Sequence, residues 1–175
     1  MDKILECFLR KQFVEVMALA AESDIVTAVP VAGLLPDRYI LDFRCRGLIC
    51  DGGEPQIHEH FVVGVFLPET YLRDEFKVSD IITVLGPHNL FHPNVRFPVI
   101  CLGEDMVAGT PLTDIVFQLY EVLTYQRLTM DESHAFNHVA CQWARANPGR
   151  IPLETRPLKR RTLDLQFAEK EDAHA

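Results

Sequence analysis

The chain has 175 residues, of which 48% are hydrophobic, and this length and composition are typical of one soluble globular domain. Its 25 acidic residues outnumber 17 Lys and Arg, and the resulting net charge of −8 argues against nucleic acid as a partner. No apolar run reaches the roughly 18 residues of a membrane-spanning helix, and charged residues interrupt the N-terminal segment, unlike a secretory signal. We therefore expect a cytoplasmic protein with no membrane partner.

The first half of the chain predicts one helix followed by four strands. Apolar residues at spacings of three and four between positions 5 and 20 indicate an amphipathic helix that ends near Glu22. The expected strands cover residues 25–31, 39–48, 58–67 and 81–85. Because the strands follow one another without intervening helices, the sequence favours an antiparallel meander in an α+β fold.

The second half predicts two further helices. One begins with Thr110 as N-cap and Pro111 as its first residue, and buries the face that carries Leu119. The other is capped by Asp131 or Ser133, turns Val139, Ala140 and Trp143 inward, and ends at residues 147–149. We expect one domain over residues 1–150, followed by a C-terminal tail, 151–175, that is first basic and then acidic and is exposed to solvent.

Five cysteines form an odd set without a CxxC pair, which indicates reduced thiols and neither a disulfide framework nor a zinc ribbon. The alternation of residues 39–48 places Cys45 in the core, and packing roles are also expected for Cys7, Cys50 and Cys141. Cys101 stands in a different context.

The segment Phe91-His92-Pro93-Asn94-Val95 comes shortly before Ile100-Cys101-Leu102. A His-Pro-Asn turn followed by Ile-Cys-Leu resembles the active-site signature of ubiquitin-conjugating (E2) enzymes. The order of elements is also similar: an N-terminal helix, a four-stranded meander, the cysteine-bearing loop and C-terminal helices. The loop before Cys101 is shorter than usual and the familiar Trp after it is absent, which resembles divergent bacterial E2-like proteins of antiphage defence and ubiquitination-like operons.

The resemblance implies a role for each residue of the motif. Cys101 would be the nucleophile that carries a ubiquitin-like protein as a thioester, and the Asn94 amide would support the oxyanion formed when an amine attacks. His92 and Pro93 would hold the turn. An acidic residue near the incoming lysine is also implied, and Asp131 is the nearest counterpart.

Two other acidic residues, Glu104 and Asp105, follow Cys101 and are alternatives for assisting the amine. The implied partners are an E1-like adenylating enzyme, a ubiquitin-like protein or another protein C-terminus, and a protein substrate. No cofactor is expected.

Two other functions remain open. One is a non-catalytic binding module of the same fold, and the other is a cysteine hydrolase in which His92, His134 or His138 serves as base. Histidines also stand at metal-compatible spacings, as His58 with His60 and as His134 with His138, but neither pair has an evident third ligand, so no metal site is expected.

Overall fold

The computed structural model describes residues 2–31, 33, 35–103 and 106–160. It begins with helix α1 (Lys3–Ala21), at whose start the Asp2 carboxylate accepts a hydrogen bond from the Ile4 amide at 3.0 Å. The apolar face of α1, which includes Leu5, Leu9 and Val16, is buried, and the predicted N-terminal helix is confirmed.

Four strands form the main sheet, each antiparallel to its neighbours and arranged in chain order, β1-β2-β5-β6. Their bounds are Val26–Pro30 (β1), Arg38–Phe43 (β2), Phe61–Phe66 (β5) and Ile82–Gly86 (β6). A short helix, α2 (Val78–Ile81), leads directly into β6. The predicted four-stranded antiparallel meander in an α+β fold is confirmed.

The structure contains an additional hairpin that the sequence did not predict. The expected strand 39–48 stops at Phe43, and the chain turns into β3 (Gly47–Asp51), which pairs with β4 (Glu54–His58). Gly47 permits this departure, because a Cβ atom there would lie 2.5 Å from the Leu123 carbonyl oxygen. The expected strand 58–67 likewise begins later, at Phe61.

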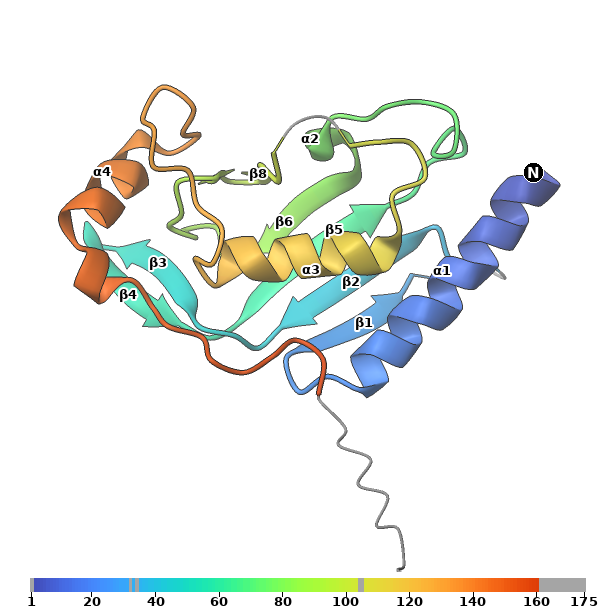
Figure 1. Ribbon diagram of the computed structural model, residues 1–175, viewed down its shortest axis with the longest axis horizontal. Coiled ribbons are helices and arrows are strands. Elements are labelled where there is room, and N and C mark those ends of the chain that lie inside the picture. The colour runs from blue at the N-terminus through green and yellow to red at the C-terminus, as the bar shows by residue number, and fades with distance from the viewer. Residues whose placement is uncertain (1, 32, 34, 104–105, 161–175) are drawn as a thin grey trace, which may run out of the picture.

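Helix α3 (Leu112–Leu123) and α1 cover one face of the sheet (Figure 1). The predicted inward face of α3 is confirmed, since Leu119 is fully buried. The predicted N-cap is wrong: the Thr110 hydroxyl donates to the Val107 carbonyl oxygen (2.7 Å), and Pro111 takes the cap position. The buried Gln12 side chain of α1 instead accepts from the Leu112 amide at 2.6 Å.

Helix α4 (His138–Ala146) starts later than the sequence predicted. The Asn137 side chain is its cap and accepts from the Ala140 amide at 3.0 Å. Asp131 and Ser133 do not cap it, because their side chains bond to each other within a turn before the helix. Ala140 is buried as expected, whereas Val139 is 68% exposed and does not point inward.

Residues 151–160 are only in part the solvated stretch that the sequence predicted, because six of the ten are exposed and three are buried. After a 3-10 turn (Pro148–Arg150), the chain runs extended across the molecule to the end of α1 (orange to red in Figure 1). Leu158 is 2% exposed and joins the main core, and the Arg160 amide donates to the Glu22 carbonyl oxygen. Among the described residues, no helix is both long and apolar enough to cross a membrane.

Candidate active site

Cys101 follows two very short strands, β7 (Val95–Arg96) and β8 (Val99–Ile100), which pair with each other. Its neighbours in sequence, Ile100 and Leu102, are buried in the main core, whereas Cys101 itself is partly exposed. The Cys101 amide donates to the Asn94 carbonyl oxygen at 2.8 Å, and its thiol donates to the Gly103 carbonyl oxygen at 3.4 Å. Burial on both sides therefore fixes the backbone while the sulfur remains accessible.

Burial makes two of the other cysteines poor nucleophiles. It raises the pKa of Cys45 to about 12, and it also raises the pKa of Cys141. Both are packing residues, as predicted. The prediction is wrong for Cys7, which is exposed on α1, and Cys50 is partly buried.

The His-Pro-Asn turn is held from inside. His92 is fully buried, and its Nδ1 accepts a hydrogen bond from the Asn94 amide at 3.0 Å. Burial lowers the pKa of His92 to about 3, so the ring is neutral. The ring packs edge-on against Tyr125, with 4.3 Å between centroids, and the Tyr125 hydroxyl donates to the Phe91 carbonyl oxygen. His92 is thus part of the support of the turn and is not available as a base.

Asn94 is only 6% exposed, and its side chain connects two loops. Its Oδ1 accepts from the Thr129 amide at 2.8 Å, and its Nδ2 makes a longer contact, 3.4 Å, with the Cys101 carbonyl oxygen. The amide nitrogen has a second hydrogen besides the one used in that contact. Asn94 therefore has both a structural role and a donor on the side of the cysteine.

The loop between α3 and α4, residues 124–137, lies against the turn. In addition to the Thr129 contact near its middle, the Asn137 amide donates to the Pro93 carbonyl oxygen at 3.0 Å. The Arg96 guanidinium also lies 5.8 Å from the centre of the Phe136 ring. This α3–α4 loop is therefore attached to the cysteine-bearing segment at several points.

Asp131 is exposed on the α3–α4 loop, and both of its carboxylate oxygens are engaged. Oδ1 accepts from the Ser133 amide and hydroxyl at 2.9 and 2.7 Å, and Oδ2 lies 3.0 Å from His134 Nδ1. Hydrogen bonds lower the pKa of Asp131 to about 2. The bond from the Ser133 hydroxyl contributes most, the bond from the Ser133 amide is next, and the contact with His134 is third. Asp131 is accordingly a charged acceptor and a weak base.

The other acidic alternatives, Glu104 and Asp105, lie outside the described residues. Next to them, Gly103 has a positive φ of 121°, and a Cβ atom there would approach Arg127 Nη2 to 2.8 Å. The Arg127 guanidinium therefore lies against the backbone that accepts the Cys101 hydrogen bond.

Among the described residues, no three His, Cys, Asp or Glu side chains are grouped where they could hold a metal ion. His60 instead pairs with Asp42 at 2.9 Å. His134 precedes α4 and therefore does not share a helix with His138, which is the first residue of α4.

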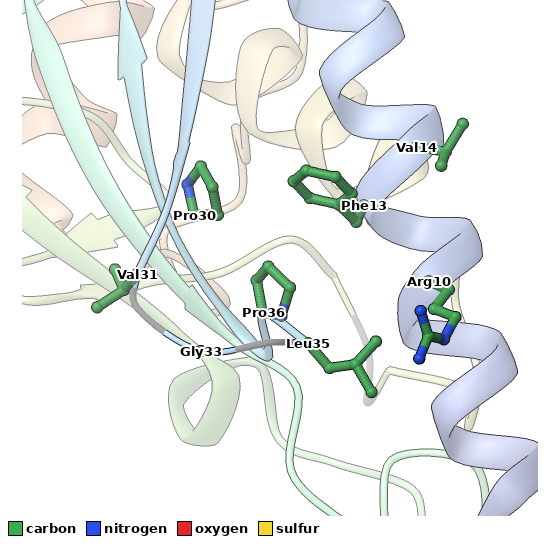
Figure 2. Close-up of a pocket in the computed structure, with 8 residues that line it drawn as sticks. All are labelled: Arg10, Phe13, Val14, Pro30, Val31, Gly33, Leu35 and Pro36. Carbon is green, nitrogen blue, oxygen red and sulfur yellow. The ribbon is translucent and has the colours of Figure 1, made fainter.

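A separate apolar hollow lies between α1 and the segment after β1 (Figure 2). Its volume is about 460 Å³, and Phe13 projects from α1 toward Pro36 on the facing segment. Its lining residues are Arg10, Phe13, Val14, Pro30, Val31, Gly33, Leu35 and Pro36. None of them belongs to the cysteine loop or to the α3–α4 loop, so the hollow is a surface distinct from the candidate site.

No protein-family model and no curated protein matches this chain. The interpretation of the site therefore depends on its residues and their geometry. The sequence predicted roles for Cys101 and Asn94 but did not predict the contacts of Tyr125 and Thr129, which support the turn from 34 and 35 residues away. Their contacts use a hydroxyl and a backbone amide outside any motif, so no local signal in the sequence marks them.

Proposed function

We propose that the chain is an E2-like transferase, which carries a ubiquitin-like protein as a thioester on Cys101 and passes it to an amine. The observation that carries the proposal is the accessible Cys101 thiol between two buried neighbours, with the Asn94 amide bonded to the cysteine backbone. A fixed backbone with a free sulfur suits a group that must accept and release a bulky acyl chain.

The chemistry of transfer fits the groups that surround the sulfur. A thioester is already activated, so the site needs a donor for the developing oxyanion and a positioned, deprotonated amine. Asn94 is the donor in this proposal, and the buried His92 keeps the turn in place. The order of helix, antiparallel meander, cysteine loop and helices agrees with a ubiquitin-conjugating-enzyme-like fold.

The partners in this proposal are an E1-like adenylating enzyme, the ubiquitin-like protein and a protein substrate. The pathway we propose is bacterial antiphage defence or a related ubiquitination-like system. No cofactor enters the reaction, because ATP is consumed by the adenylating partner before the acyl group reaches Cys101.

A cysteine hydrolase is the second candidate, and the Asp131–His134 pair is the observation that favours it. Such an enzyme requires an imidazole that accepts the proton of the nucleophile. The Cys101 thiol instead donates to the Gly103 carbonyl oxygen, and the nearby His92 is buried with its Nδ1 occupied. We therefore favour the transferase.

The test is thioester formation with purified components. The protein is mixed with ATP and with the E1-like and ubiquitin-like products of genes next to its own, and is then run on gels with and without reductant. We expect an adduct that reductant removes, none in Cys101→Ala, and a reductant-resistant ester or no adduct in Cys101→Ser. Cys141→Ser and the exposed-site variant Cys7→Ser are the controls and should load normally. A labile adduct that persists in Cys101→Ala would refute the assignment, and cleavage of a conjugate without ATP would indicate the hydrolase.

A further inference from the structure

The α3–α4 loop presents an imidazole that is oriented by a carboxylate. His134 Nδ1 lies 3.0 Å from Asp131 Oδ2, and Asp131 is held in turn by the amide and hydroxyl of Ser133. The His134 side chain is 78% exposed, so the remainder of its ring faces solvent. This pair is exposed and is not part of the core, and its hydrogen bonds join Asp131, Ser133 and His134 of the loop to one another.

The anchors of the loop limit how far the pair can lie from the His-Pro-Asn turn. Thr129 is bonded to Asn94, and Asn137 is bonded to Pro93, so both ends of the segment that carries the pair lie on the His-Pro-Asn turn. His134 is three residues from the second anchor, and consecutive Cα atoms are 3.8 Å apart, which keeps it within about 11 Å of that anchor. Asn94 in turn contacts the Cys101 backbone.

The contacts of His134 Nδ1 indicate which nitrogen is reactive. Nδ1 lies 3.0 Å from Asp131 Oδ2 and 3.2 Å from the Ser133 hydroxyl, and this hydroxyl already donates to Asp131. An imidazole whose Nδ1–H donates to a carboxylate carries its lone pair on Nε2, on the opposite side of the ring. A base oriented by a carboxylate in this way is the arrangement used in nucleophilic catalysis. Asp131 itself is unsuited to take the proton, because its hydrogen bonds to Ser133 lower the pKa of its carboxyl to about 2.

We infer that His134, oriented by Asp131, is the base that deprotonates the incoming amine during transfer from Cys101. This inference rests on the proposed function, and it makes Asp131 a positioning residue. His134 Nε2 takes a proton from the ammonium group of the acceptor, and the freed nitrogen lone pair forms a C–N bond with the thioester carbonyl carbon. The C–S bond then breaks, and Cys101 leaves as a thiolate. The thiolate takes up the second proton that the attacking nitrogen loses as it becomes an amide, and the imidazolium releases its own proton to water. The products are an amide, a free thiol and one proton.

The neighbouring charges leave this role to His134. Glu132 is paired with Arg145 of α4 at 2.8 Å, and the Arg96 guanidinium from β7 lies over the Phe136 ring. His138 is exposed at the first position of α4. Asp131 is thus the charged group that contacts the His134 ring, and this contact holds the ring in one orientation on the loop.

The test separates loading from discharge. The Cys101 thioester is formed first, E1 activity is then stopped, and discharge to free lysine is followed in a single turnover from about pH 6 to 9. For His134→Gln we expect discharge about a hundredfold slower near neutral pH, with loading unchanged. The deficit should shrink as the pH approaches the lysine pKa of about 10.4, because the solvent then supplies deprotonated amine.

Asp131→Asn should give a smaller deficit with the same pH trend, since the base remains but its orientation is lost. His138→Gln is the matched control, because this exposed histidine lies on α4 only four positions away, and it should discharge at the wild-type rate. Discharge of His134→Gln at the wild-type rate at every pH, or an equal deficit in His138→Gln, would overturn the inference. Failure of the wild-type protein to form any thioester would instead overturn the proposed function on which it rests.

Discussion

Replacing Asn94 with Ala tests whether its side chain acts in chemistry as well as in structure. The substitution removes the acceptor of the Thr129 amide and the donor to the Cys101 carbonyl oxygen. The first loss affects the attachment of the α3–α4 loop. The second removes the amide that we propose for the oxyanion.

The two losses differ in size and in the quantity that reports them. An orphaned, partly buried N–H costs about 1–3 kcal/mol, and the 3.4 Å contact adds little because it is long. If the free energy of unfolding falls by about 2 kcal/mol, the melting temperature of a chain of this length falls by roughly 4–8 °C. One oxyanion donor contributes about 3 kcal/mol to a transition state, so discharge should slow by about a hundredfold or more. Loading should change by less than about threefold, because the donor serves the attack by the amine.

The assay is single-turnover loading and discharge together with thermal unfolding of the same preparations. Asn137→Ala is the matched control: it removes the α4 cap, which costs about 1 kcal/mol, at the other anchor of the same loop. Its backbone bond to Pro93 and the Asn94 amide both remain. We expect this control to lose stability but to discharge normally. Equal slowing of discharge in both variants, or equal slowing of loading and discharge in Asn94→Ala, would refute the oxyanion role.

Two further predictions concern stability. Leu119→Ala should lower the free energy of unfolding by about 3 kcal/mol and the melting temperature by roughly 6–12 °C, because Leu119 is fully buried on α3. The Phe117 residue of the same helix is 40% exposed, so Phe117→Ala should lower the free energy of unfolding by less. An unchanged melting temperature in Leu119→Ala would show that the assignment of the buried face of α3 is wrong. The Glu154 carboxylate binds Arg156, and hydrogen bonds from the Arg156 side chain are the chief cause that lowers the pKa of Glu154 from 4.5 to about 2. The stabilising effect of this carboxylate is therefore present above pH 4.5 and is lost as the pH falls toward 2. Glu154→Gln should therefore be less stable by about 2 kcal/mol at neutral pH in urea unfolding, a figure reduced for the half-exposed Arg156, and a difference that persists unchanged at pH 2 would contradict this ion pair.

The sequence predicted those elements whose cause is local. The apolar spacing of α1, the four strands of the meander and the buried face of α3 all follow from periodicity, which the backbone geometry of helices and strands imposes. Cys45 was placed in the core by the same alternation. These features depend on a few consecutive residues, and those residues are visible in the sequence.

The errors arose where a distant contact decides the conformation. The end of β2 depends on Gly47, which allows the chain to approach the Leu123 carbonyl oxygen, 76 positions away. The start of α3 depends on Gln12, which supplies the hydrogen bond that Thr110 was expected to make. The basic side chains of Arg156, Lys159 and Arg160 are exposed as expected, but the backbone between them is held on the core by Leu158, a contact that the sequence did not predict.

The same distinction explains the candidate site. The motif predicted Cys101 and Asn94 correctly as neighbours, since the Cys101 amide bonds to the Asn94 carbonyl oxygen within one short loop. It did not predict that Asn94 also holds the α3–α4 loop, because the partner is the backbone of Thr129 and any residue except proline supplies that amide. A single side chain thus bonds to the backbone of Cys101 on one side and holds the loop of Asp131 and His134 on the other. The proposed oxyanion donor and the proposed base therefore share one attachment, which predicts coupled, non-additive discharge defects when Asn94 and His134 are replaced together.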